Sequence, residues 1–123
     1  MKTTAHSFFV TASLLIILGM LMGIYMSASG NFAIAPAHGH LMLFGFVALT
    51  IFGTYYKLWP MAGATRLARI HLWVSIVALI VFVPGIALAN LEISDVYAKL
   101  GSVLVLISAL MFAWSVLRNS AAE

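Results

Sequence analysis

The stretch that decides the fold is APAHGHLMLFGFVALTIFGTYYKLWP, residues 35–60. It is a long apolar run with two histidines, His38 and His40, near its front end. An imidazole is costly to place in hydrocarbon unless both ring nitrogens find partners. The stretch therefore raises two questions: what surrounds the run, and what the two histidines bind.

The composition of the whole chain indicates a membrane environment. The chain has 123 residues, of which 64% are hydrophobic and 7% are charged, whereas a soluble domain has about 25% charged residues. So few charges cannot cover a water-facing surface, and we expect an integral membrane protein whose first partner is the lipid bilayer. The lack of cysteine excludes disulfides, thiolate metal sites and iron–sulfur clusters. No basic patch away from the span ends suggests a nucleic-acid partner.

Four segments are long and apolar enough to cross a bilayer, which takes roughly 20 residues each. They are residues 8–28, 38–59, 70–90 and 96–117. Because the connections are short, the spans should pack as sequential antiparallel neighbours. We predict an all-α fold, an integral membrane four-helix bundle in a single domain over residues 1–123.

The distribution of charge predicts the orientation. Basic residues gather at one end of the predicted bundle: Lys2, Lys57, Arg66, Arg69 and Arg118. The first connection is uncharged, and the third carries Glu92, Asp95 and Lys99. The positive-inside rule then places both termini on the cytoplasmic side, and we expect the bacterial inner membrane.

Residues 1–30 also have the pattern of a signal peptide, with Lys2, an apolar run and then small residues. The apolar run exceeds the usual signal-peptide length of about 7–15 residues, so we expect a retained first span. Within this span Gly19 and Gly23 form a GxxxG pattern, and Ala109 and Ala113 repeat the small-residue spacing in the last span. Such pairs allow close helix packing, and we expect this within the bundle rather than between subunits.

The four histidines fall into two groups by depth. His38 and His40 lie near the outer face, whereas His6 and His71 lie at the cytoplasmic ends of their spans. Helical residues two apart point about 200° apart, so His38 and His40 face opposite sides and serve different sites. Neutral imidazole is a common axial ligand of haem iron, and His40, followed by Leu, Met and Phe residues, is the first candidate ligand. His38 is the second.

The other two histidines are weaker candidates for a haem or metal ligand. His6 can be hydrated in the headgroup region. His71 can pair with Tyr55 or with a backbone carbonyl.

The same residues resemble a known family. Residues 35–60 resemble the tenth helix of subunit I of the haem-copper oxidases and their nitric oxide reductase relatives. The matching residues are His38, His40, Gly45, Gly53, Tyr55, Tyr56 and Pro60. The next stretch, ARIHLWVSIVALIVFVPG, is similar to that family's following helix, and its matching residues are His71, Trp73, Phe82 and Pro84. The likeness covers roughly residues 35–90.

The resemblance implies that His38 takes the role of the ligand to the high-spin haem and His40 that of the ligand to the low-spin haem. It also implies that His71 binds no haem. The family's remaining haem and copper ligands come from helices that this chain lacks, so it is not expected to be a complete oxidase or reductase, and copper is not expected. The family fold is roughly three four-helix arcs, so a homo-oligomer, a trimer or a dimer, can supply what one chain lacks.

These observations favour a small membrane b-type cytochrome that binds haem b through histidine. It would transfer electrons, with a redox protein partner at the outer face, or bind a gas such as NO or O₂. The alternative is a cofactor-free accessory or assembly subunit of a respiratory membrane complex. A third possibility, copper or zinc binding at His38, is weakened by the lack of cysteine and of any carboxylate deep in a span. The same lack of buried charge argues against a transporter.

Overall fold

The computed structural model describes residues 2–119, and within them every regular element is a helix. The elements in chain order are α1 (Thr4–Ser29), α2 (Ala35–His40), the π-helix η1 (Leu41–Ala48), α3 (Leu49–Leu58), α4 (Pro60–Gly63), α5 (Arg66–Asn90) and α6 (Val96–Asn119). The elements α2, η1 and α3 follow one another without a break and form one continuous span, Ala35–Leu58.

The prediction of an all-α membrane protein with four spans is confirmed. Four helices are each long and apolar enough to cross a membrane: Thr4–Ser29, Ala35–Leu58, Arg66–Asn90 and Val96–Asn119. Each extends the predicted span by a few residues at one or both ends, except that the second stops at Leu58. Little of each span is buried inside the chain, because most of the apolar side chains face outward, where lipid replaces a protein core.

Local sequence explains where the helices begin and end. Thr3 caps α1 by accepting a hydrogen bond from the His6 N–H at 3.1 Å, and Thr65 caps α5 in the same way from the Ala68 N–H at 3.1 Å. Both caps satisfy a backbone donor that the first helical turn leaves free. The first helix ends at Gly30, whose φ of 68° is a left-handed conformation that glycine adopts without strain.

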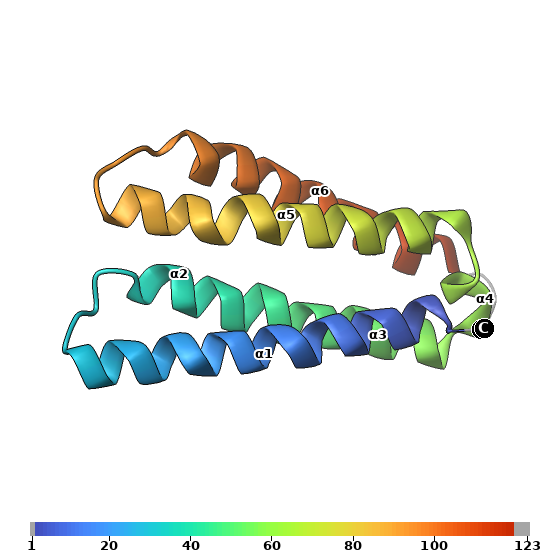
Figure 1. The fold of residues 1–123 in the computed structure, drawn as a ribbon. Coiled ribbons are helices and arrows are strands. Elements are labelled where there is room, and N and C mark those ends of the chain that lie inside the picture. The colour runs from blue at the N-terminus through green and yellow to red at the C-terminus, as the bar shows by residue number, and fades with distance from the viewer. Residues whose placement is uncertain (1, 120–123) are drawn as a thin grey trace.

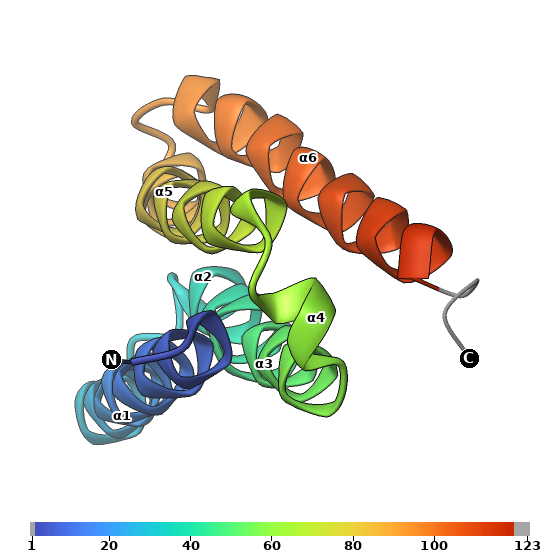
Figure 2. The same cartoon turned by 90° about the vertical axis from the view of Figure 1, so that its right-hand side faces the viewer.

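The spans form two antiparallel hairpins. One consists of α1 and the second span, the other of α5 and α6, and α4 joins them (Figure 1). Viewed along the bundle, α1 and α6 lie on the outside, with the second span and α5 between them (Figure 2). The connections at 30–34 and 91–95 share one end, named here the His-pair end for His38 and His40. The opposite end, with Arg66 and both described chain ends, is named the basic end (Figure 1).

Glycines set the closest helix contacts. A Cβ on Gly85 would lie 2.6 Å from the backbone nitrogen of Ala98, and one on Gly101 would lie 2.6 Å from the Cβ of Phe82. Helices α5 and α6 therefore touch backbone to backbone, as small residues permit in membranes.

The GxxxG glycines of the first span pack inside the chain, as expected. Gly19 faces Met42 and Gly23 faces His38, both on the second span. Ala109 and Ala113 are exposed, so they do not pack against another helix of the described chain.

Candidate functional site

The two histidines of the His-pair end lie on α2. This short stretch of regular α-helix directly precedes the π-helix η1. Pro36 stands in the first turn of α2, where its missing N–H costs nothing and its fixed φ suits a helix. Both histidines are therefore held by regular backbone at the start of a span, and the 200° geometry applies to them.

The imidazole of His40 is arranged as a ligand. Its Nδ1 lies 2.7 Å from the carbonyl oxygen of Pro36. A carbonyl can only accept, so Nδ1 carries the proton and neutral His40 has its free lone pair on Nε2. Metal-bound histidines commonly use this arrangement, in which a backbone carbonyl fixes the tautomer and orients the ring. The ring is exposed and stands edge-on to Phe82 of α5, with ring centroids 5.3 Å apart.

The imidazole of His38 points the other way, toward α1. A Cβ on Gly23 would lie 3.2 Å from its Cε1, so the absence of a side chain at Gly23 makes room for the ring. The Nδ1 atom of His38 is buried and has no hydrogen-bond partner among the described residues. A buried polar atom without a partner costs roughly 1–3 kcal/mol, which marks this nitrogen as one that can gain from a bound water or ligand.

His38 and His40 therefore face opposite sides of their helix, toward α1 and α5 respectively. This agrees with the geometry expected from their spacing, and it means that the two rings cannot share one ion. Among residues 2–119 there is no group of three or more His, Asp or Glu side chains placed to hold a metal. A ligand at this end must reach one histidine at a time.

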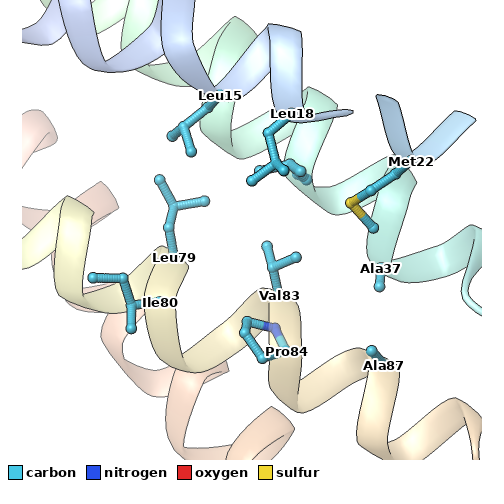
Figure 3. A pocket seen from close by; sticks show the side chains of 10 residues that line it. Leu15, Leu18, Met22, Ala37, Leu79, Ile80, Val83, Pro84 and Ala87 are labelled. Carbon is cyan, nitrogen blue, oxygen red and sulfur yellow. The ribbon is translucent and has the colours of Figure 1, made fainter. Parts of the chain in front are cut away.

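A cavity of about 370 Å³ lies between α1, α2, η1 and α5, and it extends from the middle of the bundle toward the His-pair end. Leu15, Leu18 and Met22 of α1 face Leu79, Val83 and Ala87 of α5 across it, with Ala37 at one side (Figure 3). Every lining side chain is apolar, and neither His38 nor His40 is among them. The cavity separates the two hairpins, but it supplies no polar group that would bind or orient a head group.

The basic end holds a different histidine site. His71 of α5 is fully buried, with an exposed fraction of 0%, and both ring nitrogens are paired. Nδ1 lies 2.9 Å from the hydroxyl of Tyr56 on α3, and Nε2 lies 3.1 Å from the Oγ of Ser108 on α6. The predicted alternatives, Tyr55 and a backbone carbonyl, are wrong. The hydroxyl of Tyr55 instead donates to the carbonyl oxygen of Ser115 at 3.3 Å.

Aromatic rings surround His71. The ring centroids of Phe52, Phe8 and Phe112 lie 4.6, 5.3 and 6.2 Å from that of His71. His71 thus links three spans from inside an apolar shell, and no free nitrogen is left for iron.

His6 lies in the first turn of α1 and is exposed, while its backbone N–H serves the Thr3 cap. Nothing in its surroundings builds a binding site.

Some features of both sites could not be found from the sequence. The π-helix has no residue signature. Ser108 and the buried Ser75 of α5, whose hydroxyl oxygens lie 2.7 Å apart, look like ordinary small residues of apolar spans. One signal was available: a histidine, a tyrosine and two serines in adjacent spans each need a polar partner in a membrane, and partners at the same depth are the obvious source.

Comparison of the chain with protein-family models, with curated proteins and with solved structures finds no match.

Proposed function

We propose that this protein is a small membrane b-type cytochrome in which His40 is an axial ligand of haem iron. The observation that carries the proposal is the bond of the His40 Nδ1–H to the Pro36 carbonyl, which leaves the lone pair of the neutral ring on Nε2 of an exposed residue. The exposed His40 stands edge-on to the half-buried ring of Phe82, and an apolar macrocycle bound at Nε2 would lie beside this pair. The likeness of residues 35–90 to the haem-copper oxidase family supports the same assignment and is itself part of the proposal.

The residues present suit a haem at an interface better than a haem enclosed in one chain. Each face of α2 offers one imidazole, His40 on one side and His38 on the other, and the cavity between the hairpins is bordered by neither. Coordination by two histidines on one face would then use His40 from two copies, in a dimer or a trimer. His38, whose Nδ1 has no partner in the described part of the chain, is the second candidate ligand on the opposite face.

Bound haem would supply one-electron redox chemistry or, with an axial position open, reversible gas binding. The protein's share is to present Nε2 of His40 in the right tautomer, to hold the ring against Phe82, and to keep the surroundings apolar. An apolar shell around an iron centre affects its reduction potential and the access of solvent.

The first experiment is the visible spectrum of the purified protein, expressed with an ample haem supply. It is recorded oxidised, reduced, and reduced with carbon monoxide. A reduced six-coordinate b-type spectrum that carbon monoxide leaves unchanged supports electron transfer. A shift with carbon monoxide supports gas binding at an open site. A colourless protein contradicts the proposal and favours a cofactor-free accessory subunit.

The orientation is part of the same proposal, with the basic end in the cytoplasm of a bacterial cell. It rests on the charges of that end and on the positive-inside rule. Since the chain has no cysteine, single cysteines at Ala33 and Ala64, in opposite connections, can be labelled in intact cells with a membrane-impermeant thiol reagent. Labelling at Ala33→Cys alone supports this orientation, and labelling at Ala64→Cys alone reverses it.

A further inference from the structure

The hydrogen bonds around His71 can be assigned a direction. The Oγ–H of Ser75 donates to the carbonyl oxygen of His71 at 2.7 Å, because a carbonyl only accepts. Ser75 and Ser108 are 2.7 Å apart, and since the Ser75 hydrogen is already used, Ser108 must be the donor between them. The Ser108 oxygen then accepts from His71, whose Nε2 therefore carries the proton. This leaves Nδ1 of neutral His71 as a bare lone pair that accepts the Tyr56 O–H.

This arrangement also satisfies a second protonation state. If the phenolic proton of Tyr56 moves along the 2.9 Å bond, His71 carries a hydrogen on both nitrogens. Its Nδ1–H then donates back to the Tyr56 oxygen, and its Nε2–H still donates to Ser108. No donor is orphaned in either state and no side chain has to move, so the proton shift involves little reorganisation of the surroundings.

Tyr55 provides a contrast one residue away. Its hydroxyl donates to the Ser115 carbonyl oxygen, which is not a base, so its proton has nowhere to go. Of the two adjacent tyrosines, only Tyr56 can lose a proton and an electron together.

A line of oxidisable rings leads from Tyr56 to the surface. The ring centroids of Tyr56 and Tyr55 are 5.5 Å apart, and Tyr55 stacks on Trp59 with centroids 4.9 Å apart. Tyr56 is buried, with an exposed fraction of 1%, whereas Trp59 is 36% exposed at the basic end. The three rings therefore connect the bundle interior with that end of the molecule.

We infer that Tyr56 is a site of reversible one-electron oxidation, with His71 as its proton acceptor and Tyr55 and Trp59 as the electron path to the surface. A one-electron oxidant at the basic end, such as a radical or a high-valent metal complex, takes one electron from Trp59. Tyr56 supplies an electron to Trp59 across the ring of Tyr55, which keeps its proton and is not itself oxidised, and the Tyr56 O–H proton passes to Nδ1 of His71. The products are a neutral Tyr56 radical, a protonated His71 and an oxidant reduced by one electron. Reduction of the radical returns the proton to the tyrosine.

The test uses the full chain in detergent with a photochemically oxidised ruthenium polypyridyl complex in the aqueous phase. Tyrosyl radical is followed by transient absorption and electron paramagnetic resonance. The wild type should form a long-lived neutral tyrosyl radical, and Tyr56→Phe should lose it. Tyr97→Phe, at an exposed tyrosine of the other end, is the matched control and should keep it. An undiminished radical in Tyr56→Phe overturns the inference.

His71→Gln separates the proton acceptor from the structural partner. Its amide oxygen can still accept the Tyr56 hydrogen bond, but an amide takes up no proton at neutral pH. The long-lived radical should disappear while helical circular dichroism is unchanged, and a radical of wild-type yield overturns the role of His71. If this variant fails to fold, the test is the rate at which the radical forms in the wild type after exchange into deuterated water. A slowed rise of the radical supports proton-coupled oxidation, and an unchanged rise contradicts it. Neither experiment requires bound haem, so the result is independent of the proposed cytochrome function.

Discussion

The two ends of the bundle differ in how their histidines are hydrogen-bonded and how far they are exposed. At the basic end, both ring nitrogens of His71 are hydrogen-bonded inside a shell of phenylalanines and the ring has no exposure. At the His-pair end, Nδ1 of His38 has no hydrogen-bond partner within residues 2–119, and His40 is an exposed residue whose Nδ1 is paired and whose Nε2 carries the lone pair of the neutral ring. A membrane protein can satisfy an imidazole with its own polar groups, as it does for His71. The end where it does not is where a ligand from outside the chain has something to gain.

Under the proposed cytochrome function, the largest effect expected from this contrast is the loss of haem in His40→Ala. The ring is exposed, so its removal leaves no buried cavity and the helical content should not change. Haem content, measured from the reduced difference spectrum per mole of protein, should fall to background. His6→Ala is the control, because His6 is also exposed and builds no site. Haem retained in full by His40→Ala would contradict the assignment of the ligand.

The second effect tests the packing behind His40. A methyl group at Gly101 would be forced against the backbone of Phe82, the residue whose ring contacts His40. Overpacking of this kind costs about 1–3 kcal/mol or more, and we expect Gly101→Ala to lower the thermal midpoint of the protein in detergent.

The matched control for Gly101→Ala is Gly39→Ala, the same substitution at a glycine of α2. Nothing lies within 4 Å of a Cβ at Gly39. Alanine in a helix is favoured over glycine by up to about 1 kcal/mol, so this variant should be as stable as the wild type or slightly more stable. A Gly101→Ala variant as stable as Gly39→Ala would mean that α5 and α6 are not in close contact at Gly101.

A third effect measures the closed site at the basic end. His71→Phe keeps a ring of similar size but removes the His71 acceptor of the Tyr56 hydroxyl and the His71 donor to the Ser108 oxygen. Side-chain hydrogen bonds in membrane proteins are worth roughly 0.6 kcal/mol on average and orphaned groups cost about 1–3 kcal/mol, so unfolding in mixed micelles should become easier by an amount in this range.

Adding Tyr56→Phe to His71→Phe should restore part of this loss, since the orphaned hydroxyl is then absent. The double-mutant cycle gives the coupling directly. Additive losses would show that the two side chains are not energetically coupled, and the contrast between the two ends would weaken.

The smallest effect concerns the surface of the His-pair end, where Nζ of Lys99 lies 2.7 Å from Oδ2 of Asp95. The hydrogen bond from Lys99, and then its charge, lower the pKa of Asp95 below the ordinary value. A carboxyl with a depressed folded-state pKa stabilises the protein above its unfolded pKa, and this is lost as the pH falls through the folded value. Lys99→Met should raise the pKa of Asp95 toward the ordinary value in a carboxyl ¹³C NMR titration. The pair is exposed, so the melting temperature should hardly change.

The sequence was sufficient for the class and the number of spans, because about 20 consecutive apolar residues leave few alternatives. It also predicted the opposite orientation of His38 and His40, since their spacing lies within one regular turn. It did not predict the partner of His71. Tyr55 and Tyr56 are adjacent, and which of the two reaches His71 depends on how α3 is rotated about its axis. That rotation depends on tertiary packing and on the backbone upstream.

The upstream backbone is the π-helix from Leu41 to Ala48, which lies between the two histidine sites. Each residue of a π-helix turns the chain through a smaller angle about the helix axis than a residue of an α-helix does. This segment therefore sets the rotation of α2 relative to α3 about their common axis. Removing one residue from it would change that rotation by about 100°. With α3 held by Tyr56 and His71, His40 would swing away from Phe82 and His38 away from Gly23. The directions in which the two histidines point are thus encoded by the number of residues in a stretch that contains no histidine.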